Sequence, residues 1–346
     1  MKAVILTENK KMNIIDIPIP KINDLEVLVK VFCVGICGTD VAVYQGHYPS
    51  KENVILGHEF CGKVVKVGSK VKDFREDDYV TSEASWGCGT CYWCKRTQPS
   101  YCISSNALGR SVDGALSEFI KVPCKLLHKI SRKISNIGGQ GVVSVATGLH
   151  AINRTGIKVG DSVLIVGPGY NGLIQAQLSK QAGAIIVGVV GANNDISRLQ
   201  LAKKLGADFT VNIEDNPNWK SSLLNGHEKM GFDVLIEASG TVGGLLSCVD
   251  LVKKGGTIIE FGTSAKMINN LPQGLFYSKE ITIKGSKGGY GFYPKAIELI
   301  ELGKINVESL VTHKFTLKET PKAFKMIDGR MDDILRAVIF CNEETN

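Results

Sequence analysis

Apolar residues follow two different patterns along this chain, and the pattern changes near residue 160. Before that point, short runs rich in β-branched residues are separated by glycine and aspartate, which is typical of strands joined by turns. This pattern predicts strands at 26–34, 62–67 and 78–82. The first 150 residues therefore favour a β-rich domain.

After residue 160, fully apolar runs alternate with segments of helical spacing. The predicted strands are 162–166, 185–190, 234–237, 257–261 and 281–283, and the predicted helices between them are 173–181 and 197–205. Such alternation indicates a parallel sheet covered by helices on both faces. A helix at 293–302 and a strand at 335–340 are expected near the end of the chain.

Composition places the chain among ordinary globular proteins. Its 346 residues, 44% hydrophobic and 22% charged, suit two domains. Lys and Arg (41) exceed Asp and Glu (34), but the excess is spread along the chain and accompanies no nucleic-acid motif. No apolar run approaches the roughly 20 residues needed to cross a bilayer, and the N-terminus lacks a signal-peptide pattern. We therefore expect a cytoplasmic protein with no membrane or nucleic-acid partner.

Four of the ten cysteines form a dense cluster with the spacing C-x2-C-x2-C-x7-C. Gly87 and Gly89 permit the tight turn that brings successive sulfur atoms together. Four thiolates suit a closed tetrahedral zinc site, which is structural because no coordination position stays open. An iron–sulfur cluster or redox-active thiols are the alternatives. The predicted ligands are Cys88, Cys91, Cys94 and Cys102.

A second set of potential ligands lies earlier in the chain. Cys37 belongs to the motif GICGTD, and His58 and Glu59 belong to the motif GHE. All three residue types bind zinc, and a catalytic zinc site uses three protein ligands and an open position. A lone Cys or His is more often part of a core, but the combination near a cysteine cluster predicts a second, catalytic zinc.

A glycine-rich loop follows the predicted strand 162–166 and precedes a predicted helix. Its sequence, GPGYNG, fits the pattern G-x-G-x-x-G with Gly167, Gly169 and Gly172. The first glycine makes the turn, the second admits a pyrophosphate and the third lets the helix pack on the strand. The phosphates would lie at the positive end of that helix. The context predicts dinucleotide binding.

The residue that reads the adenosine ribose is expected at the end of the next strand. That strand ends near Gly191 without an acidic residue at its tip, and Asp195 beyond it is better interpreted as a helix N-cap. A missing carboxylate removes the repulsion that excludes a 2′-phosphate, and Arg198 could contact such a phosphate. The choice between NAD and NADP stays open, and the pattern favours NADP.

In these motifs the chain resembles the zinc-containing medium-chain alcohol and polyol dehydrogenases, with sorbitol and threonine dehydrogenases among them. The likeness continues through GHEFCGKVVKVGSKV, VDGALSEFI, LAKKLGAD, IEASG and ITIKGS and covers nearly the whole chain. It implies an α/β fold in which a Rossmann doubly wound parallel sheet is inserted into a β-rich, GroES-like catalytic domain. We expect the catalytic domain at 1–151 and 288–346 and the dinucleotide-binding domain at 152–287.

The resemblance also implies roles for single residues. Cys37 and His58 would ligate the catalytic zinc, and Glu59 also coordinates in some relatives. Asp40 would hold His58 through its other ring nitrogen. Thr39 matches the hydroxyl residue that contacts the substrate alcohol and begins proton transfer.

One further position matches the family pattern, and two positions depart from it. Thr147 matches the threonine beside the nicotinamide. The third ligand of the family, a cysteine or an acid four residues before that threonine, is replaced here by Val143, which cannot bind zinc, so we favour Glu59 as the third ligand. Ala42 replaces a histidine common in threonine and sorbitol dehydrogenases. His47 could replace that relay histidine, and a surface-loop position is the alternative.

The resemblance implies a zinc-dependent NAD(P) oxidoreductase that interconverts an alcohol and its ketone or aldehyde by hydride transfer. A secondary alcohol, polyol or sugar alcohol is the expected substrate, and a homodimer or homotetramer the expected assembly. One alternative is a zinc-free NADPH-dependent quinone or enoyl reductase of the same superfamily, which Val143 would suit. The other is a non-enzymatic zinc-binding module.

Overall fold

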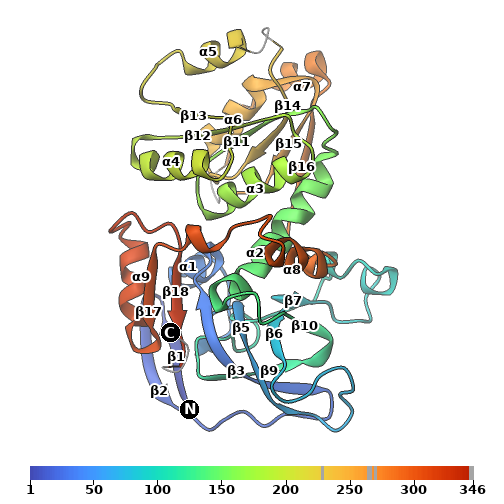
Figure 1. The fold of residues 1–346 in the computed structure, drawn as a ribbon, viewed down its shortest axis with the longest axis vertical. Coiled ribbons are helices and arrows are strands. Elements are labelled where there is room, and N and C mark those ends of the chain that lie inside the picture. The colour runs from blue at the N-terminus through green and yellow to red at the C-terminus, as the bar shows by residue number, and fades with distance from the viewer. Residues whose placement is uncertain (227–229, 263–266, 269–270, 343–346) are drawn as a thin grey trace. The chain divides into compact units, whose positions relative to one another are not determined.

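The chain forms two compact units. Unit 1 comprises Met1–Ala146 and Tyr290–Asn346, and unit 2 comprises Thr147–Gly289 (Figure 1). The structure is a computed structural model and describes residues 1–226, 230–262, 267–268 and 271–342. Both ends of the chain therefore build unit 1, and its middle builds unit 2.

Unit 1 is mainly β-structure, with a seven-stranded sheet and a three-stranded sheet. The larger sheet has the order β10-β6-β5-β3-β18-β17, and β9 also pairs with β3. Its strands are β3 (Glu26–Gly35), β5 (Glu59–Val67), β6 (Tyr79–Ser82), β9 (Phe119–Pro123), β10 (Leu127–Lys129), β17 (His313–Thr316) and β18 (Ala337–Phe340). Because β18 pairs antiparallel with β3, the C-terminal segment completes a sheet begun near the N-terminus.

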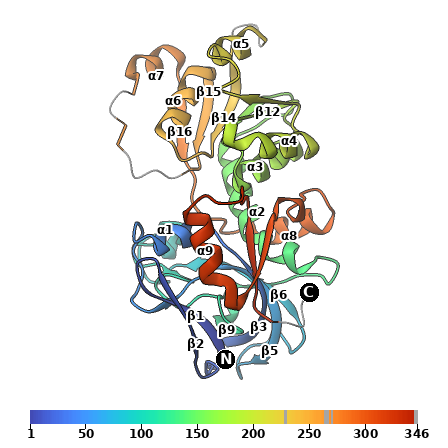
Figure 2. The same ribbon diagram turned by 90° about the vertical axis from the view of Figure 1, so that its left-hand side faces the viewer.

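The smaller sheet of unit 1 has the order β2-β1-β4, and two short strands form a separate pair. These strands are β1 (Lys2–Glu8), β2 (Lys11–Asp16), β4 (Val54–Ile55), β7 (Ser85–Trp86) and β8 (Asn106–Ala107). The helices are α1 (Gly38–Tyr44), α8 (Tyr293–Glu301) and α9 (Thr320–Asp328), and α2 (Asn136–Thr155) crosses the boundary between the units. Phe324 of α9 is buried with its ring 5.2 Å from that of Tyr44, which holds α9 against α1 (Figure 2).

Unit 2 contains a six-stranded, all-parallel sheet in the order β13-β12-β11-β14-β15-β16. Its strands are β11 (Ser162–Val166), β12 (Ile186–Gly191), β13 (Phe209–Asn212), β14 (Phe232–Glu237), β15 (Val252–Glu260) and β16 (Thr282–Gly285). The helices are α3 (Tyr170–Gln181), α4 (Ile196–Lys204), α5 (Trp219–Gly226), α6 (Val242–Leu251) and α7 (Gln273–Lys279). Helices α3 and α4 lie on the opposite face of the sheet from α5 and α6 (Figure 1).

The predicted fold class is confirmed, with a doubly wound parallel sheet between two parts of a β-rich domain. The strand at 162–166 agrees residue for residue with β11, because four apolar residues follow Ser162 and end directly at a glycine. In contrast, β15 begins five residues before the predicted 257, since Lys253 to Gly256 break the apolar pattern. Helix α3 begins at Tyr170 rather than 173, since its first turn is the glycine loop itself.

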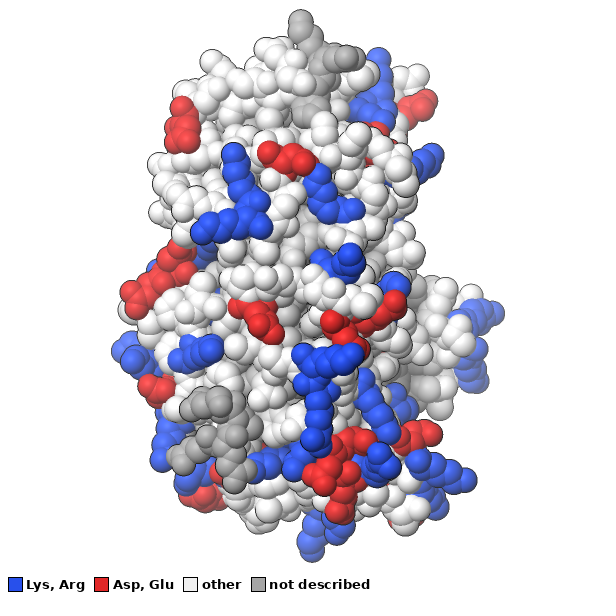
Figure 3. Space-filling model, in the orientation of Figure 1, with Lys and Arg blue, Asp and Glu red and all other residues white. Residues whose placement is uncertain are grey.

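Charged side chains of both signs are mixed on the surface. Figure 3 shows Lys and Arg interspersed with Asp and Glu over the visible face, without an extended basic stripe. Among the described residues, the longest helices are too short or too polar to span a bilayer.

Candidate functional site

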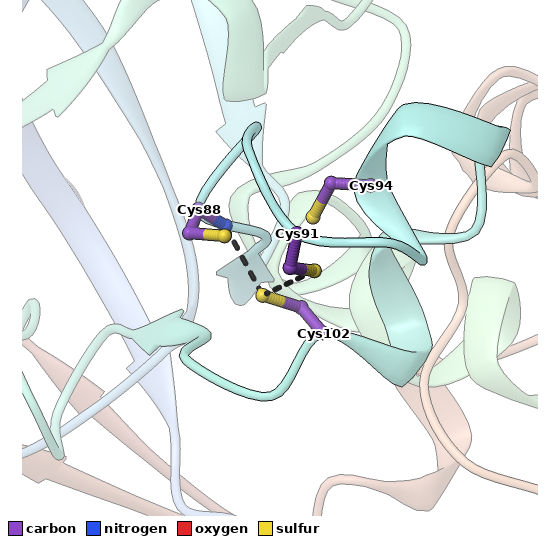
Figure 4. A group of neighbouring side chains, drawn as sticks. All are labelled: Cys88, Cys91, Cys94 and Cys102. Atoms are coloured by element: carbon purple, nitrogen blue, oxygen red, sulfur yellow. Dashed lines mark hydrogen bonds between the residues drawn. The ribbon is translucent and has the colours of Figure 1, made fainter.

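The four clustered cysteines lie on one lobe of unit 1, between β7 and β8. Their sulfur atoms point toward one another (Figure 4), and all lie within 4.8 Å of one another. Gly89 adopts a left-handed φ of 81°, and a Cβ at Gly87 would stand 2.4 Å from the Cys94 Sγ. Both glycines are therefore needed to bring the sulfur atoms together. A closed tetrahedral zinc site requires this arrangement of four sulfur donors.

Hydrogen bonds prepare part of this cluster for metal binding. The hydroxyl and backbone amide of Thr90 lower the pKa of the Cys88 thiol to about 6. The backbone amide of Cys94 lowers the pKa of Cys91. Since the thiolate is the form that binds metals, these donors favour the binding state.

The second predicted group also comes together. Ligand atoms of Cys37, His58 and Glu59 lie within 4.8 Å of one another. Cys37 is the N-cap of α1, directly after β3, whereas His58 and Glu59 stand at the start of β5. Because β3 and β5 pair with Gly35 opposite Glu59, two segments distant in sequence deliver their ligands to one place.

Asp40 fixes the orientation of this group. Its Oδ1 lies 3.1 Å from His58 Nδ1 and accepts the Gly57 amide at 3.1 Å, and its Oδ2 accepts the Cys37 amide at 2.9 Å. Burial lowers the pKa of His58, but the charge and hydrogen bond of Asp40 outweigh it and raise that pKa well above its usual value. Asp40 holds the imidazole by Nδ1, so Nε2 is left to face a metal.

Glu59 is held by partners that the sequence did not reveal. Its Oε2 accepts the Ser144 hydroxyl at 2.8 Å and forms a buried ion pair with Arg336. Arg336 also donates to the Ile36 carbonyl at 2.7 Å and to Gln140 Oε1 at 3.1 Å. The only signal in the sequence was a single arginine in the otherwise apolar run at 335–340.

One thiolate, one imidazole and one carboxylate are a donor set that zinc accepts, with a fourth position open. Glu59 Oε1 lies 3.9 Å from His58 Nε2, whereas Ser144 and Arg336 contact Oε2. Val143 is buried within α2 and provides no ligand atom, but its neighbour Ser144 holds Glu59. The described residues therefore fit a catalytic zinc without a ligand at position 143.

The other predicted catalytic residues lie on α1 and in the loop that follows it, and Thr147, predicted to contact the nicotinamide, lies on α2. Thr39 is half-buried in the first turn of α1, two residues from Cys37. His47 is exposed beyond the end of α1, where its amide donates to the Ala42 carbonyl, and it belongs to neither ligand group. Thr147 lies in α2, in the part that belongs to unit 2.

The glycine loop of unit 2 has the geometry of a phosphate-binding turn. Gly167 has a φ of 107°, and a Cβ there would stand 2.6 Å from the Ser239 amide nitrogen. A Cβ at Gly172 would stand 2.0 Å from the Gly167 carbonyl oxygen. Gly169, the N-cap of α3, has open space around its Cβ position. Two glycines thus permit close packing, and the third leaves room at the helix N-terminus for a ligand.

Two carboxylates, those of Asp195 and Glu214, contact the backbone just after β12, although the sequence indicated no acidic residue at the strand tip. Asp195 is the N-cap of α4, but its Oδ2 turns back to the Ala192 amide at 3.1 Å. Its Oδ1 lies 3.3 Å from Arg198 Nη1, so the cation expected to read a 2′-phosphate is paired with a carboxylate. Glu214, which follows β13, accepts the Asn193 amide at 3.0 Å. Sequence spacing missed Glu214 because it comes from the neighbouring strand.

Comparisons with known proteins test the family resemblance. The family described as alcohol dehydrogenase GroES-like domain matches residues 23–132, and the family described as zinc-binding dehydrogenase matches 172–302. The chain is 32% identical to a sorbitol dehydrogenase of Halalkalibacterium halodurans over 94% of its length and 96% of that protein. It is 33% identical to a D-arabitol-phosphate dehydrogenase of Enterococcus avium over 92% of both.

A solved structure shows the same fold throughout. A zinc-binding dehydrogenase from Sinorhizobium meliloti 1021, bound to NADP, superposes with a TM-score of 0.91 at 28% identity, and 98% of each chain is covered. The resemblance drawn from the motifs is therefore confirmed over nearly the whole chain. The chain is an enzyme of the zinc-type medium-chain alcohol and polyol dehydrogenase family.

Proposed function

We propose that this protein oxidises a polyol or another secondary alcohol to its ketone with a nicotinamide dinucleotide, or catalyses the reverse reduction. The proposal depends on one observation: the ligand atoms of Cys37, His58 and Glu59 lie within 4.8 Å of one another. Thr39 is two residues from Cys37, in the first turn of α1. The relatives named above are sorbitol and arabitol-phosphate dehydrogenases, which supports a polyol.

Each residue of the group has a defined task. Cys37, His58 and Glu59 would hold zinc, which when bound supplies a Lewis acid for the substrate oxygen. Asp40 keeps His58 in one tautomer and orientation through Nδ1. Thr39 accepts the hydroxyl proton of the alcohol and passes it toward solvent, which its half-buried position permits. Hydride transfer itself is the chemistry of the nicotinamide.

Unit 2 would bind the dinucleotide through Gly167, Gly169 and Gly172 at the start of α3, with Thr147 beside the nicotinamide. The sequence favoured NADP because no acid was recognised at the tip of β12. In the structure, the carboxylates of Asp195 and Glu214 accept backbone amides just after β12, and Arg198 is paired with Asp195. Carboxylates accept hydrogen bonds from a ribose hydroxyl and repel a 2′-phosphate. We therefore propose NAD as the preferred cofactor.

A metal assay combined with a substrate screen tests the proposal. We expect two zinc ions per chain and NAD-dependent oxidation of pentitols, hexitols or vicinal diols. One zinc per chain together with reduction of quinones or enoyl compounds would instead support the zinc-free reductase. Salt-dependent nucleic-acid binding without dinucleotide binding would support a non-enzymatic module. Light scattering of the purified protein tests the proposed homodimer or homotetramer.

A further inference from the structure

Two loops of unit 1 adjoin the peptide that precedes His58. The amides of Gly114, Ala115 and Leu116 donate to the carbonyls of Ile55, Gly57 and Leu56 at 2.7, 2.9 and 3.0 Å. A Cβ at Gly109 would stand 2.9 Å from the Gly57 nitrogen. The segment 109–116 is therefore fastened against the backbone that carries a predicted zinc ligand.

Arg110 extends from this segment to the second loop, which follows α1. Its guanidinium carbon lies 4.0 Å from the centre of the Tyr48 ring, and its Nε lies 3.4 Å from the Pro49 carbonyl oxygen. The Arg110 carbonyl accepts the Lys51 amide at 2.8 Å, which ties the two loops together. Stacking on an aromatic ring and a backbone bond give this arginine a preferred orientation.

The charge of Arg110 has no counter-ion within the described part of the chain. Among the described residues, no carboxylate oxygen lies within 4.0 Å of its guanidinium, whereas its neighbour Lys51 is paired with Asp113 at 2.9 Å. Arg110 is only half-exposed, so part of its side chain has left water. The Nη groups remain available as a planar pair of donors, a geometry that suits phosphate.

Arg110 is placed to contact the end of a substrate that lies away from the reacting carbon. Cys37 is the N-cap of α1, and the Tyr48 amide donates to the Ala42 carbonyl, which lies five residues further along, about 7.5 Å along the helix axis. A substrate whose reacting carbon lies at Cys37 would reach Tyr48 and Arg110 only through several further carbons. A sugar alcohol has such a chain.

We propose that the substrate is a sugar alcohol with a terminal phosphate ester, and that Arg110, oriented by Tyr48, binds this phosphate. The inference rests on the proposed polyol dehydrogenase function and specifies its substrate class. Arg110 determines specificity and takes no part in proton or hydride transfer, so its loss affects substrate binding far more than turnover.

Steady-state kinetics of Arg110→Gln test the proposal. The panel contains pentitols and hexitols, each as the free polyol, the terminal phosphate ester and the corresponding aldonate. For the wild type we expect the highest kcat/KM with a phosphate ester. Arg110→Gln should lower kcat/KM for that ester about 10- to 100-fold, mainly through KM, and leave the free polyol unchanged, as expected for one charge-assisted contact.

Arg96→Gln is the matched control, because Arg96 also stacks on a tyrosine, at 3.7 Å from the Tyr92 ring, but on the cysteine lobe. It should leave all substrates unaffected. A wild type that prefers free polyols or aldonates, or an Arg110→Gln variant unchanged with the ester, overturns the phosphate proposal while the dehydrogenase function stands.

A wild type that oxidises no member of the panel overturns the proposed function instead. Calorimetric titration with sorbitol 6-phosphate then decides the role of Arg110 without turnover. Binding that weakens at least 10-fold in Arg110→Gln supports the site, and equal binding, or none, to both proteins contradicts it.

Discussion

Glu59 and Arg336 form an ion pair in which each residue is only 4% exposed. They are 277 positions apart in sequence and meet because β18 pairs with β3, next to β5. A Cβ at Gly35 would stand 2.2 Å from the Arg336 Nη2, so glycine at that position makes room for the guanidinium. The C-terminal segment thus supplies the counter-charge of a predicted zinc ligand.

Arg336→Met should destabilise the protein strongly, because it leaves the Glu59 carboxylate buried without its cation. Loss of one partner of a buried pair costs about 3–5 kcal/mol. Denaturant unfolding measures the effect, and zinc content reports whether the ligand group persists. The control is Lys295→Met, which breaks an exposed pair with Glu298 on α8 and should cost less than about 1 kcal/mol. Equal stability of the two variants would contradict a structural role for Arg336.

Glu59→Gln should remove the catalytic zinc and leave the structural one. The amide keeps an oxygen for Ser144 and Arg336 but lacks the negative charge with which a carboxylate binds zinc. Elemental analysis should therefore find about one zinc per chain instead of two, with activity abolished. Glu83→Gln is the control, since Glu83 is another buried acid of unit 1, 3.2 Å from His128. Two zinc ions in Glu59→Gln would show that another group is the third ligand.

Local patterns in the sequence predicted the parallel sheet and named both groups of side chains that the structure brings together, whereas the insertion of one domain into the other was implied by the family resemblance. The strand β11 and the glycines after it are defined by adjacent residues, and so is the cysteine lobe. Amphipathic or short elements were not predicted, such as β1 and α9, because their burial depends on partners far away in sequence. Phe324, for example, is buried in a core cluster that includes Tyr44, 280 positions earlier in the chain.

Dependence on partners far away in sequence also explains why three residues of the sites were not predicted. Arg336, Ser144 and Glu214 reach their partners across the fold, and none of them lies in a recognisable motif. A ribose-binding acid is expected at the end of one strand, whereas parallel neighbours bring the ends of two strands together. Spacing along the chain cannot show such contacts.

Cys91→Ser should weaken folding of unit 1 rather than catalysis as such, because a structural zinc contributes folding free energy. We expect thermal unfolding to begin several degrees lower and one zinc per chain to be lost. Cys124→Ser is the control, since Cys124 is half-buried and outside both ligand groups. An unchanged melting temperature for Cys91→Ser would contradict the structural-zinc assignment.

Gly169→Ala should reduce dinucleotide binding without affecting stability. Its backbone φ of −68° suits alanine and its Cβ would meet no protein atom, so only the proposed pyrophosphate would collide with the new methyl group. NADH fluorescence titration should show affinity at least about 10-fold weaker. Gly243→Ala on α6, also surrounded by open space, should bind NADH normally. Unchanged affinity in Gly169→Ala would mean that the phosphates do not lie at this loop.

Glu214→Gln should shift cofactor choice toward NADP. The substitution removes one of two carboxylates at the tip of β12 and keeps an oxygen that can accept the Asn193 amide. We expect the wild type to prefer NAD and the variant to raise the NADP-to-NAD ratio of kcat/KM several-fold, since a repelling charge is lost. Asp161→Asn removes a charge directly before β11, at the amino-terminal end of the parallel strands rather than the carboxyl end, and should leave the ratio unchanged. A wild type that prefers NADP would contradict the proposed cofactor and restore the preference drawn from the sequence.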